Sequence, residues 1–208
     1  MIYPGLPFKI RVERFQNTRQ PDWDWWGKLW PTPGETLRQL GISTGDALIE
    51  IGSGNGYFTL PAARIVAPAT VYALDLDASL LAEIDSLATQ QQIDNIVPVR
   101  GDARSLSDSI SESVDVGLIA NTFHGVDDYA ALLEEITTVL AETGRFIIIN
   151  WRDRPKERTR IADEPRGPPT DLRLSPAETA TIVSDATGFT QTQHIAVPPY
   201  HYALVFER

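Results

Sequence analysis

A glycine-rich stretch at residues 50–56, Glu-Ile-Gly-Ser-Gly-Asn-Gly, constrains the fold more than any other feature of the sequence. It follows the apolar run 47–51 and precedes a helical pattern at 57–66, which indicates a strand–loop–helix unit. Glycines there either form a plain tight turn or let a ligand approach the backbone closely. A dinucleotide loop, G-x-G-x-x-G, would need glycine where Tyr57 stands, and the Gly-Lys-Ser/Thr of a phosphate loop is absent. The spacing therefore argues against a pyrophosphate ligand.

The rest of the chain alternates apolar runs with helical patterns. Runs bounded by turn residues predict buried strands at 47–51, 71–76, 96–100, 114–120 and 146–150. A helix over 127–142 should stop near Gly144, and a capping box at Ser175 should begin another that ends at Gly188. Two final strands, 190–197 and 201–207, are joined so tightly that we expect an antiparallel hairpin. The pattern predicts an α/β fold with a doubly wound, mostly parallel, seven-stranded Rossmann-like sheet and an antiparallel last strand.

Three acidic residues follow or end successive predicted strands. Glu50 lies in the first strand, Asp75 in the second, and Asp102 follows the third. Open α/β sheets bind ligands at the carboxyl ends of their parallel strands, so these side chains should share one edge. Singly, each acid is more often a solvated turn residue. Together they predict a nucleoside site in which Glu50 suits a positively charged ligand and Asp75 accepts hydrogen bonds from ribose hydroxyls.

In this order, residues 50–56, Asp75 and 101–103 resemble the successive motifs of the class I S-adenosylmethionine-dependent methyltransferases. Residues 114–121 and 144–150 are similar to the family's fourth and fifth motifs, and the resemblance extends over about residues 40–206. Within the family, the chain looks most similar to small-molecule enzymes of the ubiquinone/menaquinone-biosynthesis group. The resemblance implies S-adenosylmethionine as cofactor and a single domain, with a tryptophan-rich cap segment at 1–45 and a cofactor-binding domain at 46–208.

The resemblance also implies roles for individual residues. The three glycines would face the methionine part and the ribose, Asp75 would hold the ribose hydroxyls, and Asn121 would lie near the reacting methyl group. Leu76 would lie beside the adenine, Asp102 would accept a hydrogen bond from its amine, and Ala103 would contact its ring edge. The implied cofactor-binding residues are Glu50, Gly52, Gly54, Gly56, Asp75, Leu76, Asp102, Ala103 and Asn121.

Residues for the methyl acceptor are harder to identify, because methyl transfer depends mainly on positioning and needs a base only when the acceptor loses a proton. His124, just past the fourth strand, is the candidate base; alternatively it caps the loop before the next helix. His201 is expected to be structural, and His194 to face solvent. Trp23, Trp26 and Trp30 share helical spacing, so they either pack on the sheet or line the acceptor pocket. Tyr200 is a further candidate substrate contact.

Residues 152–173 form a long segment without periodicity that carries seven basic and five acidic side chains. Long loops inside compact domains are often lids or binding loops. One interpretation is a solvated loop whose charges pair with one another. The other is a lid that attracts an acceptor bearing a carboxylate.

Composition narrows the class of partner. The formal net charge is −10, which disfavours nucleic acid and anionic membrane surfaces as partners. The chain has no cysteine and only three histidines without ligand spacing, so we expect no metal site. No secretion signal or membrane span is recognisable, which predicts a cytoplasmic protein. A small-molecule methyltransferase is therefore the first hypothesis. The alternatives are a catalytically silent S-adenosylmethionine- or S-adenosylhomocysteine-binding regulator and another adenosyl-group transferase, such as an aminopropyl transferase.

Overall fold

A computed structural model describes residues 23–208, with side chains from residue 26 onward. It contains a seven-stranded sheet of order β3-β2-β1-β4-β5-β9-β8. Strands β1 to β5 run parallel, whereas β9 is antiparallel to both of its neighbours, β5 and β8. This confirms the predicted fold class. The strands are β1 Leu48–Ile51, β2 Val71–Asp75, β3 Ile96–Arg100, β4 Val114–Ala120, β5 Leu140–Trp151, β8 Thr190–Val197 and β9 His201–Glu207.

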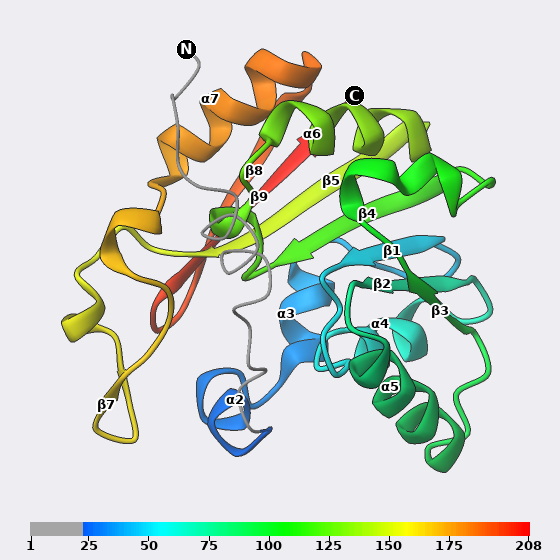
Figure 1. Ribbon diagram of the computed structural model, residues 1–208, viewed down its shortest axis with the longest axis horizontal. Coiled ribbons are helices and arrows are strands. Elements are labelled where there is room, and N and C mark those ends of the chain that lie inside the picture. Colours follow the sequence, from blue (N-terminus) through cyan, green and yellow to red (C-terminus); the bar gives the residue numbers. More distant parts are fainter. Residues whose placement is uncertain (1–22) are drawn as a thin grey trace.

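Helices cover both faces of this sheet (Figure 1). Neighbouring residues of a strand point to opposite faces, and here both sets are apolar, so both faces must be covered. Leu48 and Ile147 pack in one apolar cluster with the first three helices, while Ile49 and Ile148 pack in another with the last two. The helices are α2 Trp23–Leu29, α3 Pro33–Gln39, α4 Thr59–Val66, α5 Ala78–Gln90, α6 Tyr129–Val139 and α7 Pro176–Thr187.

The helix expected over residues 127–142 ends earlier than predicted. Helix α6 stops at Val139, and Gly144 lies within β5 instead of closing the helix. The β4–β5 register jumps between Leu140 and Arg145, so the residues between them form an irregularity in the strand. Gly144 suits this bend because a Cβ on it would lie 2.9 Å from the carbonyl oxygen of Ala141. The capping box at Ser175 and the left-handed Gly188 after α7 are both as predicted.

The segment after β5 holds two short strands, β6 (Arg160–Ile161) and β7 (Glu164–Pro165), which form a hairpin projecting from the body of the protein (Figure 1). Three short 3₁₀ segments lie in irregular parts of the chain: η1 Ala103–Asp108, which has a kink at Ser105, η3 Lys156–Arg158 and η4 Thr170–Leu172. A fourth, η2, spans Phe123–Gly125 after β4. Within residues 23–208, every helix is too short or too polar to cross a bilayer. The predicted division at residue 45 stays a prediction, and residues 1–22 of the cap lie outside the described part of the chain.

Candidate functional site

The glycine loop connects β1 to α4 at the carboxyl edge of the sheet. Gly52, Gly54 and Gly56 all have positive φ, at 71°, 56° and 89°, a conformation that other residues rarely adopt. A Cβ at Gly52 would lie 2.8 Å from the hydroxyl oxygen of Thr122, in the loop after β4. The loop therefore needs glycine at Gly52 both for its backbone conformation and for its contact with the neighbouring strand end.

Asp75, the last residue of β2, organises this loop. Its Oδ2 accepts a hydrogen bond from the backbone N–H of Gly54 at 2.9 Å, and its Oδ1 accepts one from Asp77 at 2.9 Å. Each carboxylate oxygen has a second lone pair that can accept a donor from a ligand. Leu76, beside it, is 44 % exposed although it is a large apolar side chain. An exposed leucine next to a carboxylate at a strand end suits a contact with a flat apolar ring.

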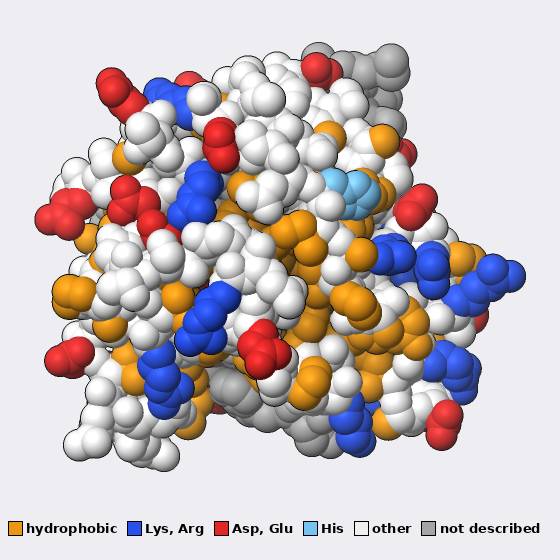
Figure 2. All heavy atoms as spheres, turned by 180° about the vertical axis from the view of Figure 1, so that it is seen from behind, with side chains coloured by type: hydrophobic (Ala, Val, Ile, Leu, Met, Phe, Trp, Pro, Cys, Tyr) orange, Lys and Arg blue, Asp and Glu red, His pale blue; other side chains and the backbone are white. Residues whose placement is uncertain are grey.

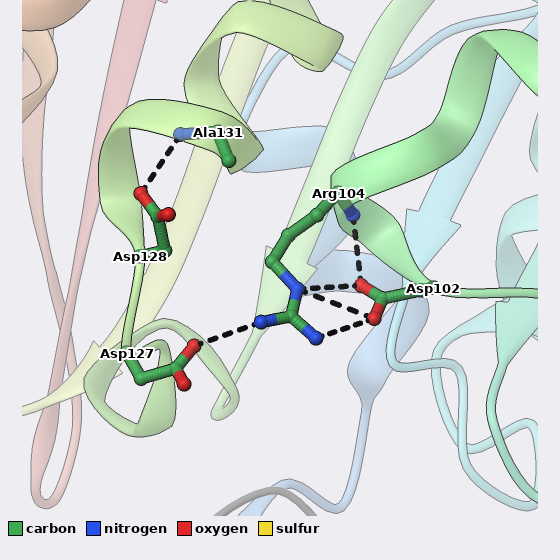
Figure 3. A network of polar contacts seen from close by, with 5 residues as sticks. All are labelled: Asp102, Arg104, Asp127, Asp128 and Ala131. Atoms are coloured by element: carbon green, nitrogen blue, oxygen red, sulfur yellow. Dashed lines mark hydrogen bonds and ion pairs between the residues drawn. The ribbon is translucent and has the colours of Figure 1, made fainter. Parts of the chain in front are cut away.

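Asp102 faces a cation that the sequence interpretation overlooked. The Arg104 guanidinium lies between two carboxylates, 2.6 Å from Asp102 and 3.2 Å from Asp127 (Figure 3). Asp102 also accepts the backbone N–H of Arg104 at 2.9 Å, while Asp128 caps α6 through Ala131. Hydrogen bonds from Arg104 hold the pKa of Asp102 below its usual range, so this carboxylate stays ionised.

A small apolar hollow lies between η1 and the ends of β1 and β4. Ala103, one of the predicted adenine contacts, is in its wall, and the Arg104 side chain borders it. Apart from that arginine and one hydroxyl, the lining is aliphatic, which suits the face of a planar ring. The lining residues are Ile51, Ala103, Arg104, Ile119, Thr122, Val126 and Leu132.

Glu50 is buried, with only 2 % of its surface exposed. Its Oε2 accepts a hydrogen bond from the Thr59 hydroxyl at 2.5 Å. Burial raises the pKa of Glu50 to about 8, opposed by the Thr59 hydrogen bond and reinforced by the nearby charge of Asp75. Without a ligand, Glu50 is therefore mostly protonated at neutral pH.

Glu50 and Asn121 line a second small pocket, to which Gly52 and Ser53 of the glycine loop also contribute. Asn121 follows β4 with φ of 59°, a strained conformation for a non-glycine residue. Its backbone N–H donates to Ile149 O at 2.8 Å, and its buried Oδ1 has no partner within residues 23–208. The pocket lining comprises Trp26, Glu50, Gly52, Ser53, Tyr57, Phe58, Ala120 and Asn121. Here an acid and an orphaned amide oxygen, both suited to a cation or an ammonium group, face the same space.

His124 lies in η2, one turn beyond β4. Its Nδ1 is 3.1 Å from the Asn150 side-chain oxygen, which also accepts the backbone N–H of Trp151 at 3.0 Å. An oxygen in that position requires the histidine Nδ1 to be the donor, which leaves Nε2 as a free acceptor. Burial lowers the pKa of His124 to about 4, so the ring is neutral at pH 7. Loop anchoring and proton acceptance are compatible, because they use different ring nitrogens.

Trp26, in α2, and Trp30, directly after this helix, pack in the core as one of the two interpretations predicts, and a role in binding the acceptor stays a prediction. Trp26 and Trp30 are buried and stack with ring centroids 5.0 Å apart. Trp30 packs on Phe58, while Trp26 also lines the pocket beside Glu50. The side chain of Trp23 lies outside the described residues. Tyr200 does not face this pocket; its hydroxyl donates to Arg160 O at 2.9 Å and so ties the final hairpin to the 152–173 segment.

Comparison with known proteins agrees with this geometry. Residues 49–148 match the family model of a methyltransferase domain. The chain is 26 % identical over 165 residues to the ubiquinone/menaquinone biosynthesis C-methyltransferase of Marinomonas sp. strain MWYL1, covering 78 % of this chain and 62 % of that protein. A crystal structure described as a SAM-dependent methyltransferase from Aquifex aeolicus superposes with a TM-score of 0.75 at 19 % identity, over 98 % of this chain and 99 % of that one.

The chain belongs to the class I S-adenosylmethionine-dependent methyltransferase family. The fold alone extends the likeness further: magnesium protoporphyrin IX methyltransferase from Synechocystis PCC 6803, solved with bound SAM, has a TM-score of 0.64 at 15 % identity, covering 96 % of this chain and 90 % of that one. The chain spans about three fifths of the length of the curated relatives that it matches. The family cofactor is S-adenosylmethionine.

Two arginines whose surroundings bear on the site were not singled out by sequence reasoning. Arg104 covers Asp102, although only its neighbours 101–103 matched a motif. Arg173, one of the seven basic residues of the 152–173 segment, is buried and lies with its guanidinium carbon 5.3 Å from the centre of the Trp151 ring. His201 is also fully buried, whereas His194 is exposed as expected. An arginine that is buried in a charged loop was not distinguishable by sequence from its solvated neighbours.

Proposed function

We propose that this protein transfers a methyl group from S-adenosylmethionine to a small-molecule acceptor. When bound, the cofactor supplies an electrophilic methyl group on a positively charged sulfur. The observation that carries the proposal is the convergence of Glu50, Asp75 and Asp102 around a glycine loop at one sheet edge. A small-molecule acceptor is further supported by the net charge of −10, which opposes polyanions.

The residues present fit the cofactor at three points. The apolar hollow beside Ala103 suits the adenine, with Asp102 next to it, and Asp75 has lone pairs left for ribose hydroxyls. The buried acid of Glu50 and the free Oδ1 of Asn121 suit the ammonium and sulfonium groups. Gly52 leaves room that a Cβ would fill. These assignments are proposals about individual side chains.

An aminopropyl transferase would need free acids after β4 to hold a polyamine. Asp127 is the nearest acid in the chain, but it is paired with Arg104 at 3.2 Å, and Asp128 caps α6. A silent binding protein shares the cofactor pocket and differs only in turnover. Titration calorimetry with S-adenosylmethionine and S-adenosylhomocysteine tests the pocket, and formation of S-adenosylhomocysteine with a metabolite panel tests turnover. Absence of binding at millimolar concentration would refute the proposal; binding with no turnover would favour the silent regulator.

For an acceptor that loses a proton, we propose His124 Nε2 as the base. Replacing His124 with glutamine keeps a donor–acceptor side chain near Asn150 but removes the basic nitrogen. We expect kcat with an acceptor found in the panel to fall by about 10²- to 10⁴-fold, with unchanged affinity for S-adenosylhomocysteine. The neutral ring at pH 7 predicts no inflection from His124 between pH 5 and 8 in the free enzyme. A loss of kcat below about threefold would assign His124 to loop anchoring alone.

A further inference from the structure

An aromatic wall leads from the pocket beside Glu50 to a buried cation. We use this name for Trp26, Trp30, His201 and Trp151. Trp26 lines the pocket and stacks on Trp30, and the His201 ring centroid lies 4.3 Å from that of Trp30 and 4.1 Å from that of Trp151. Trp151 and His201 are direct partners in the antiparallel β5–β9 pairing. Beyond Trp151, at the far end of the wall, lies Arg173.

Arg173 is a buried charge that forms no ion pair in the described part of the chain, although the charge of Glu157 lies near enough to favour its ionised form. It is 6 % exposed, and no carboxylate within residues 23–208 lies at ion-pair distance from it. Its Nε and Nη2 donate to Pro168 O, Thr159 Oγ1 and Arg166 O, which holds the loop together. Its Nη1 is buried and has no hydrogen-bond partner there. A buried guanidinium is costly unless an anion compensates it.

Two neighbours on the wall have unused polar atoms as well. His201 is fully buried, and neither of its ring nitrogens has a partner among residues 23–208. The Trp30 Nε1–H is also buried without a partner there. Burial and the charge of Arg173 hold the pKa of His201 well below its ordinary value, so the ring is neutral and offers one N–H. Buried donors normally find acceptors, and here Trp30, His201 and Arg173 each have a donor that lacks one among residues 23–208.

We infer that Arg173, with the N–H groups of His201 and Trp30, binds a carboxylate of the methyl acceptor, whose reacting end extends along the aromatic wall toward the pocket beside Glu50. This inference rests on the proposed function. Carboxylates pair with guanidinium groups through short charge-assisted hydrogen bonds, and the free Nη1 supplies one. On the face seen from behind, basic side chains gather beside an apolar area on the side where the 152–173 segment lies, which favours approach of an anion (Figure 2).

The test uses benzoate as the probe and benzamide as its uncharged counterpart. The full chain is labelled with ¹⁵N-histidine and saturated with S-adenosylhomocysteine. With only three histidines, the imidazole signals are assigned by single His→Gln variants, and exposed His194 is the internal reference. We expect benzoate to shift the His201 signals at concentrations where benzamide does not. No shift with benzoate, or equal shifts with both, would overturn the inference.

Arg173→Gln should weaken benzoate binding by roughly tenfold to a hundredfold, the range expected for a charge-assisted hydrogen bond. The matched control is Arg158→Gln, which removes the same charge from an exposed position of the same segment and should leave binding unchanged. Equal effects of the two variants would assign the binding to long-range charge and overturn the inference.

A carboxylate is also present in the cofactor, so the same variants are titrated with S-adenosylhomocysteine and 5′-methylthioadenosine, which lacks the amino-acid part. If Arg173→Gln weakens only S-adenosylhomocysteine, Arg173 anchors the cofactor and the acceptor assignment is wrong. If Arg173→Gln binds neither S-adenosylhomocysteine nor 5′-methylthioadenosine, the variant has not folded, and the test is repeated with Arg173→Lys. Lysine keeps the charge but not the planar guanidinium, so Arg173→Lys should still bind benzoate more weakly than Arg158→Gln does. Equal benzoate affinity of these two variants would overturn the inference. Failure of the unaltered protein to bind S-adenosylhomocysteine would instead refute the proposed function.

Discussion

Asp75→Ala should weaken binding of S-adenosylhomocysteine by at least about a hundredfold. The carboxylate is expected to accept both ribose hydroxyls, and each charge-assisted hydrogen bond contributes about 1.5–3 kcal/mol. Its removal also frees the backbone N–H of Gly54, which Asp75 Oδ2 holds at 2.9 Å. Affinity would fall for two reasons, the lost ribose contact and a less ordered glycine loop. Titration calorimetry measures the change in Kd directly.

The control for Asp75→Ala is Asp77→Asn, which removes one negative charge two residues away. Asp77 caps α5 by accepting the Ser79 N–H at 2.8 Å and is fully at the surface, so its replacement should leave affinity within about threefold. A second comparison separates the two causes: adenosine should lose affinity for Asp75→Ala through both, whereas 2′,3′-dideoxyadenosine, which lacks both hydroxyls, should lose only the smaller part that the less ordered loop causes. An Asp75→Ala protein that binds adenosine as tightly as the unaltered chain would refute the ribose assignment.

Most of the sheet and the cofactor edge were predictable because their signals are local. A buried parallel strand appears in the sequence as a short apolar run, and the residues at the end of that run lie at the carboxyl edge of the sheet. Glu50, Asp75 and Asp102 could therefore be assigned to one edge. The capping box at Ser175 is likewise contained in four residues. The end of α6 was mispredicted because Gly144 serves a bend in β5, and one glycine is compatible with both uses.

The proposed acceptor site was not predictable, because its residues are far apart in the sequence and meet only in the folded chain. Trp151 and His201 become partners through the β5–β9 register, and Arg173 packs on Trp151 from a loop in which six other basic residues look the same in sequence. Burial decides which of those charges lacks a partner, and burial depends on the whole fold. The protonation of Glu50 has the same origin: its acid was expected to be ionised, but enclosure between strand, loop and α4 raises its pKa.

The affinity for S-adenosylmethionine should rise with pH, by up to about tenfold per unit between pH 6 and 7.5. In the free protein, the pKa of Glu50 is raised to about 8, so the side chain carries its proton over this range. A cation in the pocket that Glu50 lines favours the ionised form and lowers that pKa, so binding releases a proton. Raising the pH removes this proton in advance, which strengthens binding until the pKa of the free protein is reached.

The stability of the fold should depend on pH in the opposite direction to the affinity for S-adenosylmethionine. The pKa of Glu50 is higher in the folded state, about 8, than its ordinary value of 4.5, so the folded chain keeps a proton that the unfolded chain loses. The contribution of Glu50 to the free energy of unfolding is therefore fully present below pH 4.5 and is lost as the pH rises from 4.5 to about 8. Glu50→Gln removes the titration and keeps an oxygen that accepts the Thr59 hydroxyl. Its free energy of unfolding should depend less on pH over this interval.

The decisive measurement compares two ligands that differ by one charge. S-adenosylmethionine has a positive sulfonium and S-adenosylhomocysteine a neutral thioether, so proton release at pH 7 should be larger for the first. Calorimetry in buffers of different ionisation enthalpy counts the protons released, and working below pH 7.5 limits titration of the ligand amino group. In Glu50→Gln, the pH slope should vanish for both ligands. The same slope in the variant and the unaltered chain would mean that another group releases the proton and that Glu50 does not face the sulfonium.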